Sequence, residues 1–302
     1  MGGFSFLRKI RIPIRICYTN MTPRKDDRVG KIILLNTPIG NLGDLTPRVL
    51  EALKAGEYFA AEDTRVFKEL LNHLGISVMG KKVFALHDHS TDAEVQRLLE
   101  NLPSGETLYV TSDAGSPMIS DPAYPLLKNA IEANFEIDSY SGVSSPIMAL
   151  ELSGLPPIPF HFQGFLPREK GKIDGAFSSL SHGTHIFFEA PTRIKSTLGI
   201  LSESSPDSDV CVVRELSKKF QQVLRFKARD WQNHQDELVE KGEFVLLVHR
   251  PRGAEVENSR EFVALAQEIL DGTAGSKGIS KLLSLILKIP TKEIYSKLNK
   301  KS

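Results

Sequence analysis

The chain contains 302 residues, of which 41% are hydrophobic and 25% are charged. These values are typical of a soluble globular protein with room for two domains, and the absence of any apolar run of about 18 residues argues against a membrane span. The formal net charge is only +1, so nucleic acid would have to bind to a local basic patch. Two cysteines are too few for a disulfide framework or a zinc cluster, and they favour a cytoplasmic protein.

The beginning of the chain, residues 1–29, is interpreted as a disordered basic extension. Residues 1–25 contain six lysines and arginines and no acidic residue. They lack the apolar core of a secretory signal. A true start at Met21 is a related interpretation, and a transit peptide stays open because such peptides are also basic and poor in acids.

Strands and helices alternate in the first half of the chain. Thr46 and Pro47 open one helix as N-cap and first helical residue, and Gly56 ends it. We predict strands over 31–36, 58–61, 83–86, 108–111 and 135–140, with further helices over 65–73, 92–101 and 124–133. This order predicts an α/β domain over residues 30–156 with a mostly parallel sheet.

A proline-rich cluster at 155–159 predicts a domain boundary. A second α/β domain with a mixed sheet is expected over 157–250, followed by a polar linker at 250–259 and a basic helical tail over 258–302. Its predicted strands cover 185–188, 210–214, 222–226 and 244–248, and its predicted helices cover 173–180 and 193–201.

Several common signatures are missing, and a different pattern is present. The sequence contains no phosphate-binding P-loop, no dinucleotide GxGxxG motif and no spaced set of His and Cys residues. Polar or glycine-containing segments instead follow five predicted strands, at 36–44, 61–65, 87–89, 111–122 and 141–145. Ligands of open α/β sheets bind outside the carboxyl ends of the strands, so these segments together predict a binding site.

Each segment taken alone also has a purely structural explanation. Gly115 and the other loop glycines suit turns with positive φ. Asp63 and Arg65 suit a surface ion pair at a helix N-cap, and Asp113 suits an Asx-turn. His87 and His89 resemble metal ligands, but no third ligand lies nearby in the sequence.

Nine motifs together resemble one known family. They are TPIGNLGDLTPRVLEAL (37–53), AAEDTR (60–65), FALHDH (84–89), SDAGSPMISDPA (112–123), SGLP (153–156), GFLP (164–167), FFEAPTRI (187–194), VVRELSK (212–218) and KGEFVLLV (241–248). Across residues 31–298 the chain is similar to the ribosomal RNA small subunit methyltransferase I family, a branch of the tetrapyrrole methylases. The resemblance implies two α/β domains of the class III methyltransferase fold, with the cofactor cleft between them, and a small helical tail.

The resemblance also implies an activity, a cofactor and partners. These are 2′-O-methylation of a cytidine in 16S ribosomal RNA of the small subunit, S-adenosylmethionine, and a homodimer without a metal. The residues that match the family's cofactor pocket are Pro38, Asp113, Ala114, Gly115, Ser144, Ser145, Leu166, Ala190, Pro191, Gly242 and Glu243.

Candidates for chemistry and for RNA contact complete the expected site. A general base would take the hydroxyl proton, and an arginine would hold a phosphate. The catalytic candidates are Glu62, Asp63, Arg65 and His87, and the RNA candidates are Lys170, Arg193, Arg214, Lys277 and Lys281. Arg214 also has the simpler expectation of an ion pair with Glu215. In the tail, Ile279, Leu282, Leu283 and Ile286 form one apolar helix face, with Lys277 and Lys281 off it.

The sequence departs from the family pattern at three places. Ala123 replaces a usual glycine, residues 141–143 replace a Pro-Gly-Pro turn, and residues 170–173 lack a usual arginine. Two alternatives to an RNA methyltransferase stay open, and the departures support only the second of them. One is a methylase of a tetrapyrrole or of a protein side chain, and the other is a non-catalytic module that binds RNA or the cofactor.

Overall fold

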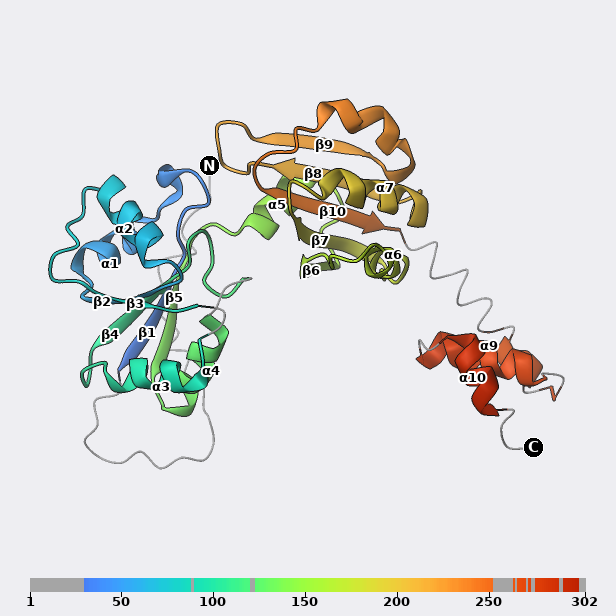
Figure 1. Cartoon of the computed structure of the whole chain (residues 1–302), viewed down its shortest axis with the longest axis horizontal. Coiled ribbons are helices and arrows are strands. Elements are labelled where there is room, and N and C mark those ends of the chain that lie inside the picture. The colour runs from blue at the N-terminus through green and yellow to red at the C-terminus, as the bar shows by residue number, and fades with distance from the viewer. Residues whose placement is uncertain are drawn as a thin grey trace, which may run out of the picture.

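The computed structural model describes residues 30–87, 90–119, 123–251, 263, 265–269, 271–272, 275–287 and 290–298. The predicted extension at 1–29, His89 and nearly all of the predicted linker lie outside these residues. The described chain forms two α/β units and a C-terminal helix pair (Figure 1). Each unit is one sheet with the helices that cover it, and we refer to the two units as the first and the second layer. No described helix has the length and apolar character needed to span a bilayer.

The first sheet, predicted to be mostly parallel, is entirely parallel, with strand order β3-β2-β4-β1-β5. Its strands are β1 (Lys31–Leu35), β2 (Tyr58–Ala61), β3 (Lys82–Ala85), β4 (Thr107–Thr111) and β5 (Glu136–Tyr140). Its helices are α1 (Pro47–Ala55), α2 (Thr64–His73), α3 (Asp92–Glu100) and α4 (Ala123–Glu132). Successive strand residues face opposite sides, so Ile32 packs toward α3 and α4 while Ile33 packs toward α1 and α2 (Figure 1).

Helix ends in this layer follow the expected capping chemistry. The Thr46 hydroxyl accepts a hydrogen bond from the Val49 amide, and Pro47 is the first helical residue of α1. Thr91 and Glu94 form a reciprocal capping box at the start of α3. These caps fix where each helix begins, and therefore the shape of the loop that connects it to the preceding strand.

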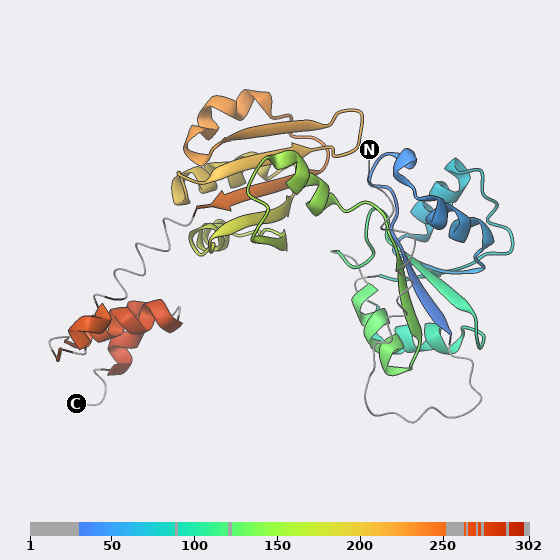
Figure 2. The same cartoon turned by 180° about the vertical axis from the view of Figure 1, so that it is seen from behind.

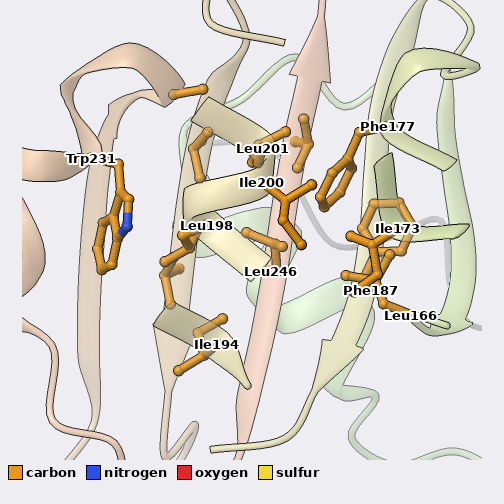
Figure 3. Close-up of a cluster of buried hydrophobic side chains, with 14 of the residues drawn as sticks. Leu166, Ile173, Phe177, Phe187, Ile194, Leu198, Ile200, Leu201, Trp231 and Leu246 are labelled. Carbon is orange, nitrogen blue, oxygen red and sulfur yellow. The ribbon is translucent and has the colours of Figure 1, made fainter. Parts of the chain in front are cut away.

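The second sheet is mixed, as predicted, with strand order β6-β7-β10-β8-β9. Only the β6–β7 pair is parallel. The strands are β6 (Phe160–Phe165), β7 (Gly183–Glu189), β8 (Asp209–Arg214), β9 (Gln222–Lys227) and β10 (Phe244–Arg250). The helices α6 (Lys170–Ser178) and α7 (Ile194–Ser204) and the 3-10 segment η3 (Ala228–Glu237) cover one face, where Figure 3 shows Phe177, Leu198 and Trp231 in a common core.

The helix α5 (Ser145–Ser153) packs on the opposite face of this sheet. Ala149 and Leu150 of α5 pack with Ile186 and Val213, and Ile39 from the loop after β1 joins the same cluster. The helix α5 precedes the predicted boundary at 156, yet it packs on β8 and β10. The core beneath the second sheet therefore contains residues from both sides of that boundary.

Some elements differ from the sequence expectations. The sequence predicted no element for α5, β6 or η3, and α6 begins three residues before the predicted start at 173. At the C-terminus, α9 (Ser276–Leu287) and α10 (Thr291–Leu298) pack against each other and lie apart from both sheets in Figures 1 and 2.

Candidate active site between the two sheets

A cavity of about 520 Å³ lies between the two layers and has walls from both. The first layer contributes the loops after β1, β2, β4 and β5, and the second contributes residues at the ends of β6, β7, β8 and the start of β10. Predicted cofactor residues that line it are Asp113, Ala114, Gly115, Ser144, Ser145, Ala190, Pro191, Gly242 and Glu243.

Two predicted cofactor residues lie elsewhere. Pro38 lines a smaller neighbouring cavity of about 290 Å³, between the loop after β1 and helix α2, where Asp113 forms part of both walls. Leu166 is only 3% exposed and packs with Ile173 and Phe187 in the core on the far face of the second sheet (Figure 3). The Leu166 side chain therefore lies in the core of the second layer and does not line the cavity.

Two acidic loops are joined at the wall of the cavity. The Asp113 amide donates to Glu62 Oε2 at 3.3 Å, and the Asp63 amide donates to Asp113 Oδ1 at 3.0 Å. Desolvation raises the pKa of the Asp113 carboxyl above its ordinary value, although the bond from the Asp63 amide opposes the shift. These two hydrogen bonds hold the Glu62 and Asp113 carboxyl groups side by side on the cavity wall.

The other catalytic candidates lie outside the cavity. Asp63 caps α2 and pairs with Arg65 at 2.6 Å, which is the surface ion pair and N-cap that the sequence offered as an alternative. The hydrogen bonds from Arg65 hold the pKa of the Asp63 carboxyl well below its usual range. Arg65 and His87 are exposed and do not line the cavity. Glu62 is thus the one catalytic candidate on the cavity wall.

Two cavity glycines have positive φ, which only glycine adopts readily. Gly115 has φ +81°, and its amide and carbonyl both bond to Thr37, so this glycine joins the loops after β1 and β4. Gly242 has φ +90°, and a Cβ there would lie 2.3 Å from Glu215 Oε1. Both positions therefore favour glycine for the backbone path, and Gly242 also requires it for space.

Glu189, which sequence reasoning missed, is a buried carboxylate on the cavity wall. It accepts hydrogen bonds from the Ala190 amide and the Thr197 hydroxyl, both at 2.7 Å, and it pairs with Arg193. Arg193 also donates to the Pro167 carbonyl at 2.9 Å. A signal existed in the spacing, because Glu189 and Arg193 lie four residues apart in the FFEAPTRI motif.

Charged groups of the second layer form ion pairs and hydrogen bonds beside the cavity. Lys218 contacts Glu215 at 3.2 Å and Glu243 at 3.0 Å, and hydrogen bonds to both outweigh desolvation and raise the Lys218 pKa. Arg214 donates to the Lys241 carbonyl at 2.6 Å and to the Phe220 carbonyl at 3.3 Å. The expected Arg214–Glu215 ion pair was therefore wrong, because Lys218 takes the Glu215 carboxylate.

The cavity is acidic and partly apolar. Among the residues that the structure describes, its lining includes the carboxyl groups of Glu62, Asp113, Glu189 and Glu243 and contains no lysine, arginine or histidine. Its apolar wall includes Ile39, Phe165, Phe188 and Phe244. Within the described residues, no cluster of His, Cys, Asp and Glu could hold a metal ion. Such a lining suits a positively charged ligand with an apolar ring.

The predicted RNA-binding lysines lie outside the cavity on exposed surfaces. Lys170 is the first residue of α6, and Lys277 and Lys281 lie on α9. The structure does not bring these two regions together with each other or with the cavity wall.

Comparison with known proteins identifies the family. Residues 31–232 match the family model of the Tetrapyrrole (Corrin/Porphyrin) Methylases. A "Ribosomal RNA small subunit methyltransferase I" from Halalkalibacterium halodurans is 38% identical, covering 74% of this chain and 77% of the relative. Proteins of the same name from Xylella fastidiosa and Bacillus subtilis are 37% and 33% identical over 88% of this chain, and 98% and 93% of their own lengths.

Solved structures share the fold at much lower identity. The methyltransferase CobJ aligns with a TM-score of 0.52 and 17% identity, covering 73% of this chain and 94% of its own. A diphthine synthase aligns with a TM-score of 0.53 and 14% identity, covering 73% and 89%. The chain therefore belongs to the tetrapyrrole methylases and, within them, to the ribosomal RNA small subunit methyltransferase I family.

Proposed function

We propose that this chain transfers a methyl group from S-adenosylmethionine to the ribose 2′-hydroxyl of a cytidine in 16S ribosomal RNA. Relatives at 33–38% identity are named as small-subunit ribosomal RNA methyltransferases, which supports RNA as the substrate. The structural observation that carries the proposal is the acidic cavity between the two layers.

The cavity suits this cofactor in charge, shape and size. The cofactor has a sulfonium and an ammonium group beside an adenine ring. The Asp113 carboxyl group lies on the cavity wall, where it can face a cation, and Ile39 and Phe188 offer apolar surface for the ring. Pockets for ligands of this size typically measure about 300–1,000 Å³. When bound, the cofactor supplies an activated methyl group on a positively charged sulfur.

Glu62 is the residue that we propose as general base. A ribose hydroxyl must lose its proton during methyl transfer, and a carboxylate within hydrogen-bond reach accepts it. Asp113 is proposed to hold Glu62 in position, since its amide donates to the Glu62 carboxylate. Arg65 and His87 are exposed outside the cavity, and we propose RNA contacts for them.

Of the residues predicted from the sequence to bind RNA, the three lysines are proposed to contact it, and Arg193 and Arg214 are not. Lys170, Lys277 and Lys281 are exposed, and lysines at such positions neutralise phosphates. Arg193 and Arg214 donate to carbonyls of their own layer, and we propose that they hold loops in place. By family resemblance, we also propose a homodimer that acts in the cytoplasm on the assembled small subunit.

Transfer of labelled methyl groups tests this proposal. Small subunits that lack the modification should accept label from S-adenosylmethionine in the presence of the protein. Glu62→Gln should lower kcat by about 100-fold or more, with the cofactor Kd changed by less than about threefold. Label found in a tetrapyrrole or a protein, with none in RNA, would overturn the proposal.

A further inference from the structure

The edge strand β6 contains a bulge directly before the cavity. Phe162 pairs with Ile186 of β7, and Phe165 pairs with Phe188. Between these two pairs, β6 therefore contains one residue more than β7. Gly164 lies within the bulge at φ +69°, and the space around it is open. A glycine at this φ lets the chain accommodate the extra residue without strain.

The bulge decides which way the Phe165 ring points. Because side chains alternate along a strand, residues 162 and 165 would face opposite sides in a regular strand. The extra residue turns Phe165 onto the face of Phe162 and Phe188, and its ring packs on Phe188 with centroids 5.4 Å apart at 63°. The next residue, Leu166, returns to the core on the other face.

Phe165 lines the cavity and is nevertheless 61% exposed. A phenylalanine that only filled the core would be buried, as Phe177 and Phe187 are in the same layer. The contact with Phe188 is tilted, and much of the ring stays open to solvent. A protein gains little stability from an aromatic ring held in this way, so the position fits a ring that contacts a ligand.

Exposed cations follow Phe165 along the chain. Arg168 and Lys170 are exposed, and neither forms an ion pair with any residue that the structure describes. Lys172, by contrast, pairs with Glu169 at 2.8 Å. Carboxyl groups line the cavity, while Arg168 and Lys170 lie outside it. An uncharged nucleotide base can therefore enter the cavity, whereas the phosphates of the RNA backbone are repelled from it and attracted to the two cations.

We propose that Phe165 is the stacking platform for the base of the nucleotide whose ribose is methylated, and that Arg168 and Lys170 contact the neighbouring phosphates. The inference rests on the proposed function and names a positioning residue for it. Single-stranded or unstacked RNA bases are commonly held on aromatic faces, with cations along the backbone.

Substitutions at Phe165 test the stacking. Phe165→Ala should lower kcat/KM for the small subunit by about 5- to 150-fold, because stacking of one base contributes that much. Phe165→Tyr should restore kcat/KM to within about threefold, while Phe165→Leu should not, because a leucine has no aromatic face. Affinity for S-adenosylhomocysteine and the Tm should remain those of the parent in all three variants.

The matched control is Phe160→Ala, which removes an exposed ring from the other end of β6 that does not line the cavity. It should leave kcat/KM unchanged. If Phe165→Ala behaves like this control, or if Phe165→Leu restores activity, the stacking role is wrong. If Phe165→Ala instead weakens S-adenosylhomocysteine binding, the ring covers the cofactor and the inference is overturned. A parent protein that binds cofactor but never labels RNA overturns the proposed function and this inference with it.

The two cations have a separate readout. Replacing Arg168 and Lys170 by glutamine should flatten the dependence of log affinity on log salt by about two units, one for each lost phosphate contact. Lys128→Gln, on the exposed side of α4, serves as the control and should leave the slope unchanged. An unchanged slope in the double variant would remove the phosphate contacts from the proposal.

Discussion

The Ser217 hydroxyl of the second layer donates a hydrogen bond to Asp44 Oδ2 of the first, at 2.6 Å. Beside it, the stem of Lys218 lies so close to Gly40 that a Cβ on this glycine would be 2.3 Å from Lys218 Cγ. We refer to these four residues as the clasp. Because they join the loop after β1 to the loop after β8, they hold together the two walls of the cavity.

Loosening the clasp should weaken cofactor binding. The net contribution of one hydrogen bond to stability is about 0.5–1.5 kcal/mol. If this free energy holds the cavity walls in the binding geometry, Asp44→Ala or Ser217→Ala should each raise the cofactor Kd by about 2- to 10-fold. Calorimetry on both variants and on the double variant would measure this. Since the two residues act on each other, the double variant should be no worse than either single one. If the losses of cofactor affinity in the two single variants add up in the double variant, the Ser217–Asp44 hydrogen bond does not link the layers.

Gly242→Ala should disturb the cavity. The added Cβ would lie 2.3 Å from Glu215 Oε1 at a backbone φ of +90°, so the Glu215 carboxylate and its Lys218 partner must move. We expect a loss of about 1–3 kcal/mol in the free energy of unfolding, and a cofactor Kd raised about 10-fold or more. Gly199→Ala in α7 is the control, because open space surrounds that glycine and alanine favours helix by about 0.5–1 kcal/mol.

Arg193→Ala should destabilise the second layer. Its partner Glu189 has a fully buried side chain, and removing one member of a buried pair costs about 3–5 kcal/mol. Urea denaturation of the variant would measure the loss. Unchanged stability, combined with weaker binding to the small subunit, would instead return Arg193 to the role of an RNA contact that the sequence suggested.

Acid should destabilise the second layer through two buried histidines. Burial lowers the pKa of His185 and of His249 below the ordinary 6.5. The unfolded chain therefore takes up more protons as the pH falls below about 6.5, and stability decreases from there downward. The ring of His161 stacks on that of His185, with centroids 4.8 Å apart. Repulsion from His161 and from Arg250 further lowers the pKa of His185.

Denaturant unfolding curves recorded at several pH values between about 8 and 5 would measure this pH dependence of the free energy of unfolding. The parent should lose stability with falling pH, and His185→Gln should flatten the curve. A parent whose stability is constant over this range, or falls only at the pH where carboxylates titrate, would contradict the assignment.

The first layer was predictable because its signals are local. Caps such as Thr46 mark helix starts, and buried apolar runs mark parallel strands, whose carboxyl ends share one edge of the sheet. The helix α5 was missed because apolar residues run through 146–152 without a clear polar face. The strand β6 was missed because the bulge at Gly164 interrupts its alternation.

The site from the second layer was less predictable for a related reason. The bulge places Phe165 at the cavity and Leu166 in the core, and no local pattern in the sequence indicates this exchange of faces. Glu189 and Leu216 reach the cavity only through the register of a mixed sheet, which no local pattern specifies. By contrast, Gly115 and Asp113 follow a parallel strand directly, and their place at the sheet edge could be expected.

Mass spectrometry of the RNA product tests the central claim most directly. Small subunits lacking the modification are incubated with the protein and S-adenosylmethionine, and their 16S RNA is digested to nucleosides. The account predicts one cytidine that carries a single extra methyl group on its sugar fragment, absent with Glu62→Gln. A methyl group on the base, or no methylated nucleoside although calorimetry shows bound cofactor, would contradict it.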